Sequence, residues 1–330
     1  MRSVGGRLAP RRDPTGPCAV HPDVRSQIII ICGPTGVGKT SFAIRLAQEF
    51  GGHIVGADSM QIYRHMDIGT AKPTAEEKSA VPHHMVDIVD PDQSFDAAVY
   101  GERAGLIIQT LLANKIVPFV VGGTGLYIKA LQYGLFESRT SDMKVRTLLK
   151  AQLAEQGAAA MHARLTVQDP QSAARIHVND AYRIVRALEV IALTGQPISA
   201  HQQAHGFRQA RYRALCIGLD MPRPQLYARI DLRVNAMIAE GLLEEVRGLL
   251  ARGYDPGLKS MQSLGYRHMI DFIQGRADWE QTIATLKRDH RRYAKRQLTW
   301  FRVDPAIQWL APDQTADATD MVKAFTLSSD

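Results

Sequence analysis

Short apolar runs alternate with amphipathic stretches along much of this chain. Helical patterns follow Lys39 and a possible N-cap at Ser94, and both lie between apolar runs. The runs have the length of buried strands and occupy residues 27–32, 53–57, 84–88, 117–121 and 213–219. Strands that alternate with helices build a parallel sheet. The pattern therefore predicts an α/β fold, with a parallel sheet flanked by helices.

A purely helical stretch interrupts this alternation. Residues 141–205 contain no strand pattern, Ser141 and Asn179 can cap helices, and Gly157 and Gly195 can end them. Further helical patterns occupy residues 222–252, 261–274 and 278–301, and Asp304 with Pro305 stops the last one. We predict a catalytic core of residues 27–140 and 206–330, and an inserted helical domain of residues 141–205.

The first 26 residues are rich in Arg, Pro and Gly and lack the apolar stretch of a secretory signal. We expect a flexible extension there. The apolar runs in the rest of the chain fall far short of the ~20 residues of a membrane helix. The cysteines Cys18, Cys32 and Cys216 lie far apart, which disfavours a disulfide framework or a zinc site. We therefore expect a soluble, cytoplasmic protein without membrane association, and a monomer.

The strongest chemical signal is a complete G-x-x-x-x-G-K-T sequence between a predicted strand and a predicted helix. Its backbone N–H groups can surround phosphate oxygens, the lysine adds a positive charge, and the threonine hydroxyl can hold Mg²⁺. A glycine turn without a ligand is the alternative, and both flanks disfavour it. The loop consists of Gly33, Pro34, Thr35, Gly36, Val37, Gly38, Lys39 and Thr40. It predicts a phosphorylated ligand without identifying it.

An acidic residue follows the second strand pattern. NTPases that hydrolyse nucleotide need an acid at the end of an apolar strand, but residues 117–121 run into Gly122-Gly-Thr-Gly-Leu-Tyr127 instead. This weakens a motor ATPase interpretation. In a doubly wound sheet, Asp58 would lie close to the phosphates that the loop binds. It is a candidate general base, and equally a candidate turn or N-cap carboxylate.

The last long helical pattern is strongly basic. Arg288, Arg292 and Arg296 recur every four residues and would share one helix face. With a net charge of +7, such a face favours a polyanionic partner, although a solvated basic face is common. Tyr293, Trp300 and Phe301 could stack on bases or belong to the core.

Taken together, these stretches resemble the tRNA dimethylallyltransferase family from about residue 27 to residue 309. Tyr182 stands where many members have Gln, and His268 stands where Gln is frequent. The sequence lacks the zinc-finger tail of some eukaryotic members, so we expect the bacterial form. The motifs that carry the resemblance are the 33–40 loop, Asp58-Ser-Met-Gln61, Gly122-Gly-Thr124, Asn179-Asp-Ala-Tyr-Arg-Ile-Val-Arg-Ala-Leu-Glu189, Gly265-Tyr-Arg267 and Lys295-Arg-Gln-Leu-Thr-Trp300.

The resemblance implies a P-loop NTPase-like fold whose phosphate loop holds dimethylallyl diphosphate rather than ATP. The prenyl group would move to the N6 amine of the adenosine 3′-adjacent to the anticodon, in tRNAs that read codons starting with U. Asp58 would take the proton from that amine. Lys39, Thr124 and, through Thr40, Mg²⁺ would stabilise the leaving diphosphate. Arg233 would also bind the diphosphate.

The resemblance also implies a set of tRNA contacts. The adenosine must turn out of its stacked loop to reach a buried site. The inserted helices would hold the anticodon stem-loop opposite the core. The residues carried over are Asp58, Ser59, Met60, Gln61, Thr124, Arg146, Tyr182, Arg183, Ile184, Val185, Arg186, Gln262, Ser263, Leu264, Gly265, Tyr266, Arg267, Lys295, Arg296, Gln297, Leu298, Thr299, Trp300, Phe301 and Arg302.

Three other functions remain open at this point. A small-molecule kinase would share the loop and Asp58 but gives no role to the basic helix. An RNA-binding NTPase would need an acid after residue 121. An adenylate prenyltransferase acting on free nucleotide would not need the inserted domain.

Overall fold

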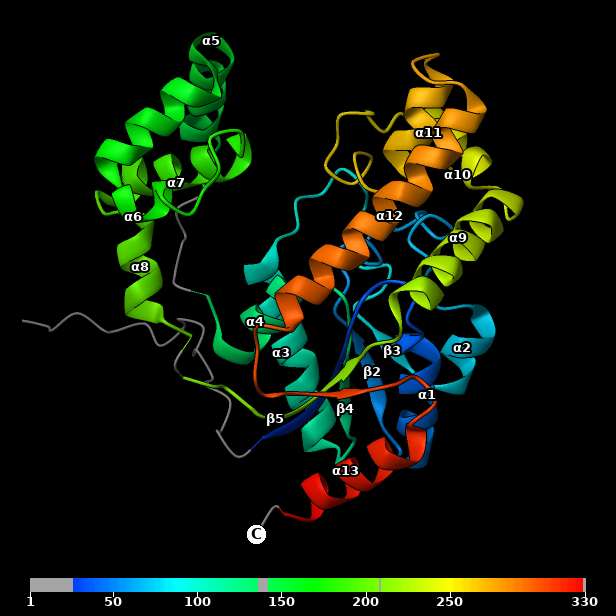
Figure 1. Ribbon diagram of the computed structural model, residues 1–330. Coiled ribbons are helices and arrows are strands. Elements are labelled where there is room, and N and C mark those ends of the chain that lie inside the picture. Colours follow the sequence, from blue (N-terminus) through cyan, green and yellow to red (C-terminus); the bar gives the residue numbers. More distant parts are fainter. Residues whose placement is uncertain (1–25, 136–141, 208, 329–330) are drawn as a thin grey trace, which may run out of the picture.

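A six-stranded parallel sheet forms the centre of the computed structural model, which describes residues 26–135, 142–207 and 209–328. The strand order is β3-β2-β4-β1-β5-β6 (Figure 1). Every neighbouring pair is parallel. The predicted α/β fold is therefore confirmed. The strands are β1 Gln27–Cys32, β2 His53–Gly56, β3 His83–His84, β4 Pro118–Gly122, β5 Arg213–Leu219 and β6 Ile307–Leu310.

The central strand β1 is buried on both faces, as expected for a parallel sheet covered by helices. Ile28 and Ile30 pack into one apolar cluster, and Ile29 and Ile31 pack into another. The alternation follows from the two-residue period of a strand. Helices α3 (Ala97–Ala113) and α4 (Gly125–Tyr133) contribute to the first cluster, and α1 (Lys39–Glu49) and α13 (Thr315–Leu327) to the second.

The edges of the sheet differ from the prediction. The predicted strand at residues 84–88 is wrong beyond β3, because Met85 and Asp87 adopt positive φ angles of 63° and 56°. Those left-handed conformations cannot continue an extended strand. Strand β6 and helix α13 were not predicted, and β6 is only four residues long and nowhere fully buried.

Several helices begin at other residues than predicted. Helix α3 is capped by Asp96 instead of Ser94, with the Asp96 carboxylate accepting the Ala98 and Val99 N–H groups at 2.9 and 3.0 Å. Residues 261–265, predicted as helix, form a turn before α11. The short helix α2 (Ala75–Ala80), which was not predicted, begins with a capping box of Thr74 and Glu77.

Four helices between α4 and β5 pack around an apolar cluster of their own. They are α5 Met143–Gln168, α6 Pro170–Ala173, α7 Ala181–Thr194 and α8 Ile198–His205. We call these helices the insert. They stand to one side of the sheet in Figure 1, in green.

The helix caps inside the insert differ from the predicted ones. Asp180 caps α7 in place of Asn179, and Asp142 caps α5, whereas Ser141 lies outside the described residues. Gly157, expected to end a helix, adopts non-helical φ and ψ angles of 81° and 164°, and this kink separates two helical segments of α5. Gly195 ends α7 as predicted, in a left-handed conformation that suits glycine.

The remaining helices cover the carboxyl ends of the strands. They are α9 Arg223–Ala239, α10 Leu242–Ala251, α11 Tyr266–Ile273 and α12 Trp279–Phe301. The predicted last basic helix is confirmed as α12, with Asp278 as its N-cap. It crosses the molecule diagonally (Figure 1) and packs against α4, α9 and α11.

No helix within residues 26–135, 142–207 and 209–328 is long and apolar enough to cross a membrane. Cys32 and Cys216 are buried free thiols, and Cys18 lies outside the described residues. The predicted N-terminal extension, residues 1–26, also falls outside them except for Ser26.

Candidate active site

The glycine-rich loop connects β1 to α1 and needs its glycines for two separate reasons. Gly33, Gly36 and Gly38 adopt φ angles of 141°, 82° and 104°, a region that side chains disfavour. A Cβ atom at Gly33 would also lie 2.6 Å from the Leu219 carbonyl oxygen. The backbone of the loop can therefore come this close to β5 only with glycine.

Lys39 is the first residue of α1 and folds back over the loop. Its Nζ donates hydrogen bonds to the carbonyl oxygens of Gly33 and Pro34, at 3.0 and 2.8 Å. Burial, and secondarily the Arg233 guanidinium, lower the pKa of Lys39 to about 8. An anion that binds beside Lys39 would therefore favour its charged form.

Asp58 follows β2 and closes a turn there, which is one of the two roles that the sequence left open. Its Oδ1 accepts the Met60 N–H at 2.8 Å and so closes a tight turn. The Asp58 side chain also lines a cavity at the carboxyl ends of the strands. Gln61 ties the same turn to the next loop, because its Nε2 donates to the Ala71 carbonyl oxygen at 2.9 Å.

Thr124 joins this turn to the loop after β4. Its N–H donates to the Ala57 carbonyl oxygen at 3.1 Å, and its Oγ1 accepts the Ser59 N–H at 3.0 Å. A Cβ atom at Gly122 would lie 2.1 Å from the Ala57 carbonyl oxygen, so glycine is needed for the two segments to approach.

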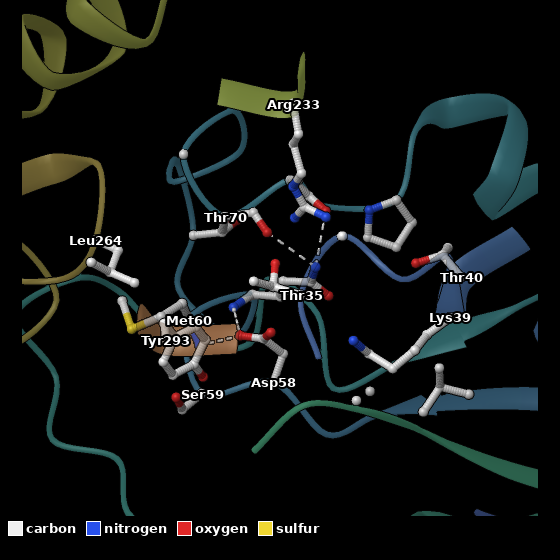
Figure 2. A pocket seen from close by; sticks show the side chains of 18 of the residues that line it. Thr35, Lys39, Thr40, Asp58, Ser59, Met60, Thr70, Arg233, Leu264 and Tyr293 are labelled. Carbon is white, nitrogen blue, oxygen red and sulfur yellow. Dashed lines mark hydrogen bonds between the residues drawn. The ribbon is translucent and has the colours of Figure 1, made fainter. Parts of the chain in front are cut away.

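These segments enclose a cavity of about 570 Å³ at the carboxyl ends of the strands. Figure 2 shows Lys39, Thr40 and Arg233 on one side of Asp58. The same view shows Met60, Leu264 and Tyr293 on the other side. The cavity thus has a cationic end and a more apolar end, with one carboxylate between them.

Helix α9 supplies two cations to the cationic end. Arg233, predicted from the resemblance, lines the cavity, and burial lowers its pKa. Its Nε has no hydrogen-bond partner among the described residues. Arg229, one turn earlier, also lines the cavity and lies close enough that a Cβ at Gly38 would be 3.3 Å from its Nη2. The sequence analysis missed Arg229, although the spacing of four residues places both on one helix face.

His290 of α12 is a second cavity residue that the sequence analysis missed. Only 6% of it is exposed, and its Nε2 has no hydrogen-bond partner in the described part of the chain. Burial, and secondarily Arg233, lower the pKa of His290 to about 4. The ring is therefore neutral at pH 7. Its spacing from Tyr293 and Gln297, at one and two helical turns, is the signal that could have revealed it.

Most of the residues predicted to bind tRNA fall into three groups in the structure. One group lines the cavity with Asp58: Ser59, Met60, Gln61, Gln262, Ser263, Leu264, Arg267, Arg296 and Gln297. A second group is exposed and lies outside the cavity: Tyr182, Arg183, Lys295, Thr299, Trp300 and Arg302. Arg146 and Arg186 belong to neither group; both bind the buried Glu189 carboxylate, at 2.8 and 2.9 Å.

The third group is buried and can act on tRNA only by supporting other residues. Ile184 and Val185 pack inside the insert, and Phe301 packs in the core. Tyr266 is also buried, and its hydroxyl donates to Glu245 Oε1 at 2.6 Å. Gly265 precedes α11, and Leu298 is half-buried against the second core cluster.

The predicted cationic face of α12 is partly neutralised by neighbouring acids. Arg288, Arg292 and Arg267 lie 3.2, 3.6 and 2.6 Å from the Asp289 carboxylate. Arg302 binds Asp220 at 2.7 Å. On α12, Arg296 lines the cavity and lies over the Tyr293 ring, and Lys295 is exposed.

Comparisons with known proteins show which family this chain resembles. The IPP transferase family profile matches residues 61–304, and the isopentenyl transferase profile matches residues 26–86. The chain is 53% identical over 296 residues to a tRNA dimethylallyltransferase from Desulfosudis oleivorans, covering 90% of this chain and 93% of that protein. It is 50% identical over 286 residues to the one from Geobacter sulfurreducens, covering 87% and 92% of the two chains.

Two solved structures have the same fold. A tRNA isopentenylpyrophosphate transferase from Bacillus halodurans is 39% identical, with a TM-score of 0.69 over 92% of this chain and 98% of that chain. A eukaryotic dimethylallyltransferase acting on tRNA is 26% identical, with a TM-score of 0.75 over 92% and 79% of the two chains.

Proposed function

This chain belongs to the tRNA dimethylallyltransferase family, and from that premise we propose how it carries out the transfer. The dimethylallyl group moves from dimethylallyl diphosphate to the exocyclic N6 amine of the adenosine 3′-adjacent to the anticodon, in tRNAs that read codons starting with U. Diphosphate is released. The observation that carries the assignment of the site is the cavity itself, where a phosphate-binding loop, a carboxylate and an apolar wall meet.

The diphosphate binds at the cationic end of the cavity. Backbone N–H groups of the glycine-rich loop and the start of α1 face an anion there. Lys39 and Arg233 add charge, and Arg229 extends the cationic wall. As the bond to the allylic carbon breaks, negative charge grows on the diphosphate. Fixed cations in a buried site stabilise that charge more than water does.

Mg²⁺ is part of this proposal. The ion usually binds through one or two protein oxygens together with substrate phosphates. Thr40 lines the cavity next to Lys39 and offers a hydroxyl of that kind. Such an ion would neutralise charge on the diphosphate.

Asp58 is placed to act as the general base. Its Oδ1 is held by the Met60 N–H, so the carboxylate stays fixed between the two ends of the cavity. The adenosine amine would approach from the apolar end, beside Met60, Leu264 and Tyr293. Asp58 would take the amine proton as the new carbon–nitrogen bond forms.

The tRNA would bind across α12 and the insert. An adenosine inside a stacked anticodon loop cannot reach a cavity lined by Asp58, so the base must be turned out of the stack. Exposed Lys295 and Trp300 on α12, and Tyr182 and Arg183 on the insert, are placed for contacts outside the cavity.

One experiment compares substrates of different size. Purified protein would receive labelled dimethylallyl diphosphate with either AMP or an anticodon stem-loop that carries consecutive adenosines. We expect efficient transfer to the stem-loop and poor transfer to AMP, because AMP lacks the binding energy that positions the amine. Equal efficiency with both acceptors, without a salt effect, would replace this proposal with the adenylate prenyltransferase alternative.

A further inference from the structure

We propose that Gln297 is a positioning residue that sets the distance between the phosphate loop and the turn that carries Asp58. The inference rests on the proposed function, which assigns diphosphate binding to the loop and proton removal to Asp58 in the turn. Gln297 lies on α12, whose outer face is the proposed tRNA surface. Its own side chain is only 6% exposed.

Gln297 uses both ends of its amide group. Its Oε1 accepts the Thr35 N–H of the phosphate loop at 2.8 Å. Its Nε2 donates to the Gly123 carbonyl oxygen, after β4, at 3.0 Å. A Cβ atom at Gly123 would lie 2.1 Å from Nε2, so the contact requires glycine at that position. A single side chain therefore bridges two loops that belong to different strands.

The second loop continues the connection to Asp58. Thr124 follows Gly123 and accepts the Ser59 N–H through its Oγ1 at 3.0 Å. Ser59 is the neighbour of Asp58, whose Oδ1 closes the turn through Met60. Hydrogen bonds thus run from the phosphate loop through Gln297 and Thr124 to the proposed base.

This arrangement gives Gln297 a different role from its neighbours on α12. Lys295 and Thr299, two residues away on either side, are exposed. Gln297 faces inward, and the Thr35 N–H that it accepts is consequently unavailable to a phosphate oxygen. The Thr35 part of the loop is therefore held against α12 by this hydrogen bond.

The reaction is sensitive to such positioning. The leaving diphosphate is held by one loop and the base by the other turn, so a shift between them changes the approach of the amine to the allylic carbon. A misplacement of about 1 Å can lower a rate on the order of 100-fold. We therefore expect loss of Gln297 to act on kcat.

The first test replaces Gln297 with methionine, which keeps most of the volume and loses both hydrogen bonds. For Gln297→Met we expect kcat to fall by about 10- to 100-fold at saturating substrates. The dissociation constant for the anticodon stem-loop should change less than about threefold, because the side chain does not face solvent. Gln281→Ala, an exposed glutamine near the start of α12, is the matched control and should leave kcat unchanged.

The second test uses Gln297→Glu and its pH profile. A protonated glutamic acid can replace both bonds of Gln297, whereas a carboxylate would place an anionic oxygen against the Gly123 carbonyl. Burial raises the pKa of such a carboxyl. The ratio of kcat for this variant to kcat of the wild type should therefore rise as pH is lowered from 9 to 6. The ratio cancels pH effects that both proteins share, and the Met variant should show no such rise.

The outcomes separate this inference from the proposed function. If wild-type protein does not transfer the prenyl group to the stem-loop, the proposed function fails first. If it does, a weaker stem-loop affinity with unchanged kcat would make Gln297 a tRNA contact and overturn the inference. A pH-independent ratio for Gln297→Glu would overturn it as well. Should Gln297→Met fold poorly, the pH profile of the Glu variant still decides, because both states are measured in one protein.

Discussion

Asp58 shows how one side chain serves both the fold and the proposed chemistry. The sequence placed Asp58 after a strand and beside a phosphate loop, because both patterns are local. Arg229 and His290 were not predicted, and Gln297 was predicted only as a tRNA contact through the family resemblance. They reach the cavity from α9 and α12, and their arrival depends on how those helices cross the sheet. Local patterns therefore predicted the residues that follow β1 and β2, and missed residues that α9 and α12 bring to the cavity.

The carboxylate of Asp58 can be tested without disturbing its turn. In Asp58→Asn the amide oxygen can still accept the Met60 N–H, so the turn should keep its shape. We expect prenyl transfer to fall about 10²- to 10⁴-fold, the usual loss for a general base. Single-turnover rates with saturating stem-loop would measure it, and binding of the stem-loop should be nearly unchanged. A fall of less than about tenfold would show that Asp58 only closes the turn and is not the general base.

Lys39 should couple ligand binding to protonation. Its pKa is about 8 in the free protein, and a neighbouring diphosphate would raise it. Near pH 8.5 the complex would then hold more protons than the free protein, so binding takes up protons and weakens as pH rises. Titration calorimetry with inorganic pyrophosphate, in buffers of different ionisation enthalpy, would measure the uptake. Lys39→Met corrects for protons taken up by pyrophosphate, and equal uptake in both proteins would contradict the prediction.

Among the elements, the central strands were predicted most closely and the edges least. Strands β1 and β5 are continuous apolar runs because they are covered on both faces, and this pattern is visible in sequence. At the edges, β3 stops where Met85 turns left-handed, and β6 has no fully buried residue. The basic face of α12 was visible in sequence, but the pairing of Arg302 with Asp220 depends on a tertiary contact.

The exposed charge of Lys295 on α12 leads to a prediction of how tRNA binding depends on salt concentration. Lys295 is exposed, whereas Arg302 is paired with Asp220, so Lys295 is the cleaner position to change. Lys295→Ala should weaken stem-loop binding and lower the salt slope by about one if it contacts a phosphate. Affinity measured from 50 to 200 mM salt gives the slope. Lys323→Ala on α13, at the far end of the sheet, is the control and should leave it unchanged.

At the scale of the whole molecule, the insert and the sheet have separate apolar clusters. The insert packs around Met161, Leu165 and Ile184, separately from the clusters that hold the sheet. The sequence indicated such a segment because strand patterns stop there, and its boundaries stay a prediction. Its position relative to the cavity could not be read from sequence, since that depends on the connections at either end.

Removing the insert should separate the two proposed substrates. A chain in which residues 142–205 are replaced by a short flexible linker should still bind inorganic pyrophosphate with unchanged affinity, because the loop, Lys39 and Arg233 lie in the core. Its affinity for the stem-loop should fall at least tenfold. Calorimetry and fluorescence titration would measure the two affinities. Loss of pyrophosphate binding in a variant that still folds would show that the insert shapes the cavity.

The pairing of β1 with β5 also has a consequence for synthesis on the ribosome. Ile28 in β1 lies beside Ala214 in β5, so the centre of the sheet cannot close until the ribosome has passed that residue. The insert is complete before then and can fold first, because local helical contacts form fastest. The hydrogen bond between Gln297 and Thr35 can form only later, after Gln297 has been synthesised. A nascent chain therefore carries its glycine loop early, and completes the proposed site only when α12 emerges.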